Sequence, residues 1–174
     1  MATSGTTTFD LSIDDIIEEA YERCGVRTSS GYDLKSARRS LNIMFSEWGN
    51  RGVHLWKVEL KEQLLTAGTR TYTAPSNAND VLEAYISTTT GLSTSTNEVS
   101  LTKISRSEYA ALPNKGAQGQ PSQYYVDRQT TPTITLYLTP DASTYTYLKY
   151  YYLKRIEDAG AYTNQADVVF RFIP

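Results

Sequence analysis

Few residues of this chain have the types and spacing that catalysis or metal binding requires. The 174 residues include one cysteine, Cys24, and one histidine, His54, so Ser/His/Asp or Cys/His catalysis would depend on His54 alone. One cysteine and one histidine cannot form a zinc site, and the acidic residues near the N-terminus lack the loop pattern of a calcium site. Gly116 and Gly119 match neither common phosphate-binding motif. We therefore expect no catalytic residue, no metal and no cofactor, and we predict that the protein is not an enzyme.

Composition and charge exclude further classes of protein. The apolar fraction is 40%, and 17 lysines and arginines stand against 19 acidic residues, a net charge of −2. This balance does not favour a dedicated nucleic-acid binder or a protein held on anionic membranes. The N-terminal residues have no basic and apolar regions of a signal peptide, and no stretch approaches the length of a membrane span. We expect a soluble protein without a membrane anchor.

Residues 12–52 have the pattern of an amphipathic helical hairpin. The first helix should begin at Ser12, whose hydroxyl can accept from the amide of Asp15, and Gly25 should end it in the left-handed conformation. Its apolar stripe, which we expect to be buried, comprises Ile13, Ile16, Ile17, Ala20, Tyr21 and Cys24. A second helix is predicted from about Asp33 to Gly49, with an apolar stripe that can pack on the first.

The charges of the two helices differ in sign. The first helix carries the acidic side chains Asp14, Glu18 and Glu22. The start of the second helix carries the basic side chains Lys35, Arg38 and Arg39, and Ile43 lies away from its apolar stripe. An acidic helix on one copy can face a basic helix on the next, which is the head-to-tail contact that a ring requires. These seven residues are candidates for a subunit interface. The alternatives are a solvated acidic face and a harmless exposed isoleucine.

From Trp56 the apolar period changes to two, which predicts strands. Trp56 alternates with Lys57, and the same alternation continues through Val58, Leu60 and Leu64, so these apolar residues should face inward. Strands are predicted over 56–64, 70–73, 81–86, 123–128, 133–139 and 145–156. We expect hairpins to join 56–64 to 70–73 and 133–139 to 145–156. A loop at Thr88–Asn97 should be mobile.

A short helix should interrupt the strands. Ser105 and Glu108 have the spacing of a capping box, and Pro113 soon ends the helix. The predicted fold class is α+β, an N-terminal amphipathic helical hairpin packed on an antiparallel β-rich lobe with one short inserted helix. We expect one composite domain with a flexible arm over 1–11, a helical lobe over 12–52 and a β-rich lobe over 53–174.

Four tyrosines of the β-rich half are candidate contacts to a partner protein or ligand: Tyr124, Tyr125, Tyr150 and Tyr152. Tyrosines lie on both sides of the strand predicted over 145–156. Such rings can grip sugars or line a protein interface. They can equally form a core with ordinary cross-strand pairs.

Several short motifs in a constant order resemble a known family. They include AYERCG over 20–25, EWGNRG over 47–52, ISRSEY over 104–109 and GQPSQYY over 119–125. Together they resemble the head-to-tail adaptor proteins of short-tailed phages, the tail-tubular-A type, over nearly the whole chain.

The resemblance implies a structural role in the virion neck or tail, after synthesis in the bacterial host's cytoplasm. It implies a dodecameric ring beneath the portal, with a nozzle or distal tail protein below and tail fibres as a further candidate partner. DNA would run down the axis without sequence-specific binding, and the ring would extend the channel and help to retain the genome. The four tyrosines would then be candidates for the distal contact.

The resemblance also bears on the C-terminus. The family continues beyond the segment that resembles 167–174 into a helical region that helps to dock on the portal, whereas this sequence stops at Pro174. We expect a truncated chain for that reason. A carbohydrate-recognition or receptor-binding module of a tail is the alternative function, suggested by the tyrosine-rich strands. A small hydrolase that uses His54 is the third interpretation.

Overall fold

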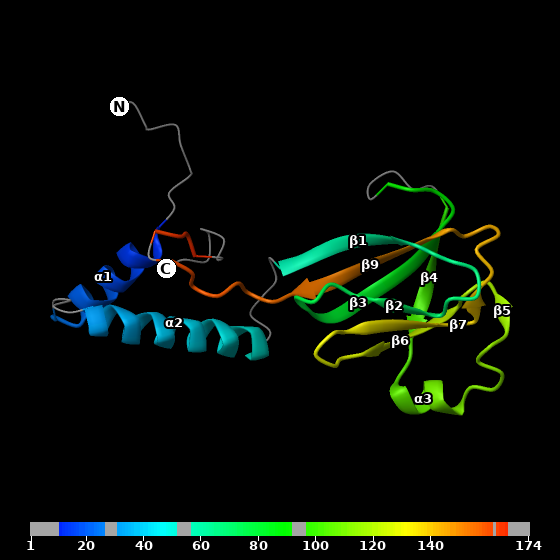
Figure 1. Ribbon diagram of the computed structural model, residues 1–174, viewed down its shortest axis with the longest axis horizontal. Helices are drawn as coiled ribbons and strands as arrows, with labels where there is room; N and C mark the ends of the chain where they lie inside the picture. The colour runs from blue at the N-terminus through cyan, green and yellow to red at the C-terminus, as the bar shows by residue number, and fades with distance from the viewer. Residues whose placement is uncertain (1–10, 27–30, 52–56, 92–96, 162, 167–174) are drawn as a thin grey trace. The chain divides into compact units, whose positions relative to one another are not determined.

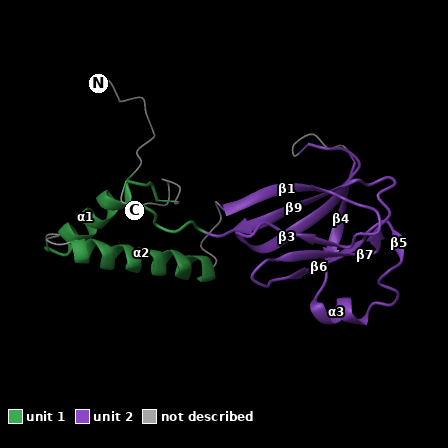
Figure 2. Ribbon diagram, in the orientation of Figure 1, with its two compact units in different colours: residues 1–56, 156–174 green, residues 57–155 purple. Residues whose placement is uncertain are grey.

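The computed structural model describes residues 11–26, 31–51, 57–91, 97–161 and 163–166 (Figure 1). The chain divides into two compact units, unit 1 from residues 1–56 and 156–174 and unit 2 from residues 57–155 (Figure 2). The α+β class is confirmed, because two N-terminal helices precede a curled, mostly antiparallel sheet with a short inserted helix. The predictions for residues 1–10, His54, Trp56 and residues 167–174 lie outside the described residues. No described helix is long and apolar enough to cross a membrane.

Unit 1 contains α1 (Ile13–Arg23) and α2 (Gly31–Arg51). The predicted start of α1 is confirmed, since Ser12 Oγ accepts from the Asp15 amide at 3.1 Å. Asp15 Oδ2 accepts in return from the Ser12 amide at 3.0 Å, and the hydrogen bond with the Ser12 side chain is the main reason that the pKa of Asp15 is lowered. Gly25, with φ of +70°, follows the helix in the left-handed conformation, as expected.

The core of unit 1 joins both helices to the segment that follows the last strand. Its buried residues are Ile13, Ile17, Leu41, Phe45 and Ala159. The Ala159 amide donates to Asn42 Oδ1 at 2.7 Å, and an Arg38 guanidinium nitrogen donates to the Gly160 carbonyl at 3.2 Å. Residues 156–161 therefore complete the apolar surface that the two helices alone would leave open.

The expected burial of Cys24 and Ala20 was wrong. Cys24 is exposed because it is the C-cap of α1, beyond the last turn that packs on α2, and Ala20 is exposed as well. The second helix extends two residues beyond the approximate end at Gly49, to Arg51. Glycine costs a helix only about 1 kcal/mol relative to alanine, and an ion pair between Glu47 and Arg51 spans this last turn.

Unit 2 is built on a seven-stranded sheet of order β1-β9-β3-β4-β6-β7-β2. The strands are β1 (Val58–Leu64), β2 (Thr71–Thr73), β3 (Ala78–Ser87), β4 (Glu98–Lys103), β6 (Gln123–Asp127), β7 (Thr133–Tyr137) and β9 (Tyr147–Lys154). Neighbours are antiparallel except β4 and β6, which are parallel and enclose the predicted short helix α3 (Arg106–Ala111) in sequence. A separate two-stranded pair joins β5 (Gln118–Gly119) to β8 (Thr139–Pro140).

The two predicted hairpins do not form. β1 pairs with β9, where Leu60 lies opposite Tyr151, and β2 pairs with β7, where Tyr72 lies opposite Ile134. The turn at 66–69 carries the chain from one edge of the sheet to the other, and the Tyr72 hydroxyl holds this turn by donating to the Thr69 carbonyl at 2.8 Å. β4 was not predicted, because only Leu101 in this polar strand is buried.

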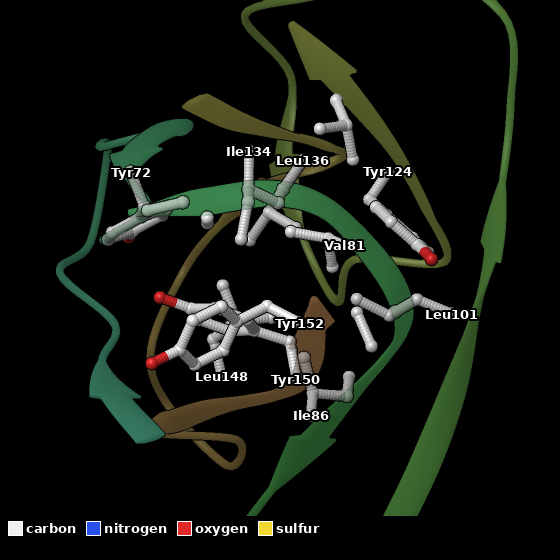
Figure 3. Packing of buried hydrophobic residues seen from close by; sticks show 14 of the residues in the cluster. Tyr72, Val81, Ile86, Leu101, Tyr124, Ile134, Leu136, Leu148, Tyr150 and Tyr152 are labelled. Carbon is white, nitrogen blue, oxygen red and sulfur yellow. The ribbon is translucent and has the colours of Figure 1, made fainter. Parts of the chain in front are cut away.

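The curled sheet closes around an apolar interior (Figure 3). Val81, Ile86, Ile134 and Leu148 are each 0% exposed and come from three strands, and tyrosines of β2, β6 and β9 fill the remaining space. Each fully buried aliphatic side chain of this kind contributes about 1.5–3 kcal/mol.

The apolar residues of β1 that were expected to face inward lie on the outer face of the sheet. Val58 is 39% and Leu64 60% exposed, whereas Lys57 is buried. Partners directly opposite in a sheet share a face, and Val58, Leu60 and Leu64 lie opposite Leu153, Tyr151 and Tyr147. The inner face of β9 is occupied by Leu148, Tyr150 and Tyr152, so the register with β9, rather than the alternation within β1, decides which β1 side chains are buried.

Candidate interaction surfaces

An acidic row lies along α1. Asp14, Glu18 and Glu22 are spaced by four residues and share one side of the helix. Glu18 and Glu22 are exposed and make no ion pair within the described residues, and Asp14 Oδ1 is covered but has no hydrogen-bond partner there. Like charges four residues apart destabilise a helix by a few tenths of a kcal/mol. The row is therefore a surface that a cationic partner would stabilise.

The basic candidates on α2 separate into two groups. Lys35 and Arg39 are exposed and four residues apart, and Ile43, one turn further on, is 62% exposed as expected. Arg38 is only half-exposed and bonds to the Gly160 carbonyl. Arg38 thus holds the segment after β9 within unit 1, and Lys35 and Arg39 are the basic candidates of α2 that face outward.

Three of the four candidate tyrosines belong to the core. Tyr124, Tyr150 and Tyr152 are 1%, 0% and 6% exposed, and Figure 3 shows them among the interior side chains. Tyr124 Oη donates to the Leu82 carbonyl at 3.0 Å. Burial raises the pKa of each of the three phenols to about 12, with a hydrogen bond to Glu59 as a further cause for Tyr152. These three rings therefore form part of the core, which was the alternative to a binding role. They offer no open stack of rings to a sugar.

Tyr125 is the candidate that remains at the surface. Its ring stacks on that of Tyr109 in α3, with centroids 5.6 Å apart and planes at 19°. Tyr125 also lines an open pocket of about 520 Å³ formed by the end of β4, the start of α3 and β6. Other residues that line the pocket are Lys103, Ile104, Arg106, Val126 and Arg128.

The pocket carries a surplus of positive charge. Asp80 Oδ2 accepts from Arg128 at 2.7 Å and from Lys103 at 3.0 Å, so one carboxylate serves two cations. Lys103 also donates to the Val81 carbonyl at 2.6 Å. Arg106 has no ion pair or hydrogen bond from its side chain among the described residues. This pocket could not be predicted because β4 was not among the strands that the sequence indicated. The ISRSEY motif, which contains Arg106, was the one signal that pointed to this region.

A buried lysine holds a loop on the outer face of the sheet. Lys149 is 1% exposed, and its Nζ donates to the Gly91 carbonyl at 2.6 Å and to Glu98 Oε1 at 3.1 Å. Glu62 accepts from the Gly91 amide at 2.9 Å and from Thr90 Oγ1 at 2.8 Å. The loop over 88–97 was expected to be mobile, but its first residues are fixed by these bonds, while 92–96 lie outside the described residues. Within the described chain, no three His, Cys, Asp or Glu side chains gather as a metal site.

The sequence profile of the SU10 adaptor protein family matches residues 34–172. The chain belongs to this family. As a member of the SU10 adaptor family it is a phage adaptor protein, a component of the virion neck that associates with portal and tail. The match includes Lys35, Arg39 and Ile43 on α2 and the whole of unit 2 with its pocket, whereas α1 precedes it. A comparison with curated proteins gave no match.

Proposed function

We propose that this SU10 adaptor family member is a structural head-to-tail adaptor that forms a ring beneath the portal. The ring would extend the DNA channel, help to retain the genome and dock a nozzle or another distal tail component. The observation that carries the proposal is the family match over 34–172. Twelve copies and the tail-tubular-A type follow from the resemblance of the sequence motifs described above.

The unlike charged surfaces of unit 1 support a ring contact. The acidic row of Asp14, Glu18 and Glu22 on one copy would face Lys35 and Arg39 on the next, with Ile43 as an apolar addition. Exposed ion pairs contribute only about 0–1 kcal/mol each. Closure of a ring repeats the same contact at every subunit, so weak individual pairs become a strong joint.

We further propose that the adaptor performs no catalysis and that DNA passes through it without specific binding. The net charge of −2 supports a conduit, because strongly basic walls would retain phosphates by the same counterion release that drives DNA binding.

Electron microscopy of the purified protein, alone and mixed with the portal of its phage, tests this proposal. We expect rings, or ring-shaped densities attached to the portal. Monomers under both conditions would contradict the adaptor function. The carbohydrate-binding alternative would gain support from glycan binding that is lost on Tyr125→Ala, since Tyr125 is the candidate ring left at the surface.

A further inference from the structure

We propose that the pocket between β4, α3 and β6 binds an acidic segment of a partner protein, with Arg106 holding a carboxylate and Tyr125 contacting the apolar part of the segment. The inference rests on the proposed function in one respect, that the partner is a neighbouring virion protein. The proposal places the contact with the partner protein at this pocket and not at the buried tyrosines of unit 2.

The charge of the pocket selects an anionic group. Lys103 and Arg128 share the Asp80 carboxylate, so their charges are partly neutralised where they stand. Arg106, at the first position of α3, has no such partner among the described residues and lines the same open pocket. A guanidinium presents a fixed fork of donors that matches a carboxylate in a bidentate pair. The place for an incoming anion is therefore at Arg106.

The wall beside Arg106 is apolar and held in position. Tyr125 is stacked on Tyr109, and Lys115 fastens the end of α3 by donating to the Leu112 carbonyl at 2.7 Å and to the Ala110 carbonyl at 2.9 Å. Ile104 completes this wall. Because these groups are already ordered, binding would cost little side-chain entropy. A rigid tyrosine next to an arginine is a combination enriched at the energetic centres of protein interfaces.

The surrounding acids favour a protein segment over DNA. Asp80 is in contact with two of the three cations, Glu108 caps α3, and Asp127 precedes Arg128. A duplex presents a continuous row of phosphates that would meet these carboxylates, whereas a flexible segment can bring a single carboxylate to Arg106. Residues 57–155 hold ten lysines and arginines against eight acidic residues, so the positive surplus is local to the pocket rather than spread over unit 2.

The test is a titration of the full chain with the peptide acetyl-Glu-Tyr-Glu-Glu-Leu-amide at low salt, followed by calorimetry and by the NMR shifts of Arg106 and Tyr125. A peptide with Gln in place of every Glu and a DNA duplex of about 12 base pairs serve as comparison ligands. We expect the acidic peptide to bind and Arg106→Gln to weaken binding by about fivefold or more, the effect of losing one charge-assisted pair. Arg70→Gln is the matched control, since Arg70 is an exposed cation of unit 2 outside the pocket, and it should change binding by less than about twofold.

Three results would overturn the assignment. They are no binding of the acidic peptide, equal weakening by both variants, and tighter binding of the duplex with the same dependence on Arg106. Circular dichroism checks that Arg106→Gln is folded, which is expected because its side chain makes no hydrogen bond or ion pair within the described residues. Rings on the portal without peptide binding would contradict the peptide-binding pocket but not the adaptor function. Peptide binding without rings would contradict the adaptor function but not the peptide-binding pocket.

Discussion

Tyr152 of β9 donates a hydrogen bond of 2.6 Å from its hydroxyl to Glu59 Oε2 of β1, so an interior ring is tied to the edge strand of the sheet. Tyr150, two residues earlier on the same inner face, lies 6.2 Å from Tyr152 between ring centroids. Its hydroxyl is buried without a hydrogen-bond partner among the described residues. Two neighbouring phenols thus have opposite energetic roles.

Replacing each phenol by phenylalanine should separate these roles. Tyr152→Phe removes a charge-assisted bond and should lower the free energy of unfolding by about 1 kcal/mol, because the partly exposed Glu59 can rebind water. Tyr150→Phe removes a buried hydroxyl without a partner, so it should be neutral or stabilising. Urea denaturation of the two variants measures both. A larger loss for Tyr150→Phe than for Tyr152→Phe would mean that the Tyr150 hydroxyl is satisfied in solution.

The three core phenols predict a loss of stability at high pH. Their pKa is about 12 in the folded protein against an ordinary value of 10.0, so the folded state holds these protons more tightly than the unfolded chain. The stabilisation is complete below pH 10 and disappears as pH rises from 10 through about 12. Thermal unfolding at a series of pH values, with tyrosinate absorbance recorded in parallel, tests this. A constant midpoint across that interval would contradict the burial of the three rings.

The buried lysine should be needed for the order of the loop that it holds. Lys149→Met keeps the length of the side chain but leaves Glu98 unpaired and the Gly91 carbonyl without its donor. We expect a loss of about 2 kcal/mol, below the usual cost for a fully buried pair because Glu98 is partly exposed. Hydrogen exchange should accelerate at Thr90 and Gly91. The exposed Lys61 offers the control Lys61→Met, and equal exchange in both variants would disprove the anchor.

Reversal of charge on α2 should weaken assembly. Arg39→Glu would place an acid opposite the α1 row of the neighbouring copy, and repulsion at every contact should reduce the amount of ring on the portal. Arg51→Glu makes the same change at the end of α2, where the native side chain pairs with Glu47 among the described residues, and it should assemble normally. Sedimentation velocity with portal present measures both. Normal assembly of Arg39→Glu would remove this surface from the ring contact.

The parts of the fold that could be predicted are those that depend on neighbours in sequence. Ser12 and Ser105 both cap their helices as their spacing indicates, because a capping box needs only residues three apart. The period of two correctly marked most strands. The exposure of Ile43 could also be predicted, since it follows from its angle on the helix.

Features that depend on long-range pairing could not be predicted. The alternation in β1 shows that Val58 and Glu59 face opposite sides of the sheet. Which side faces inward follows from the pairing of Glu59 with the buried Tyr152 of β9. Lys149 has no local signal for burial, because its partners come from β1 and from the residues around β4. The pocket escaped prediction for the same reason, since Asp80, Arg106 and Arg128 come from three separate segments.

A cryo-electron microscopy reconstruction of the virion neck tests the central claim most directly. The adaptor account predicts copies of the curled sheet of unit 2 repeated around the axis, between the portal and the distal tail. Location of this chain at a fibre or at the tail tip, or its absence from the virion, would contradict the account.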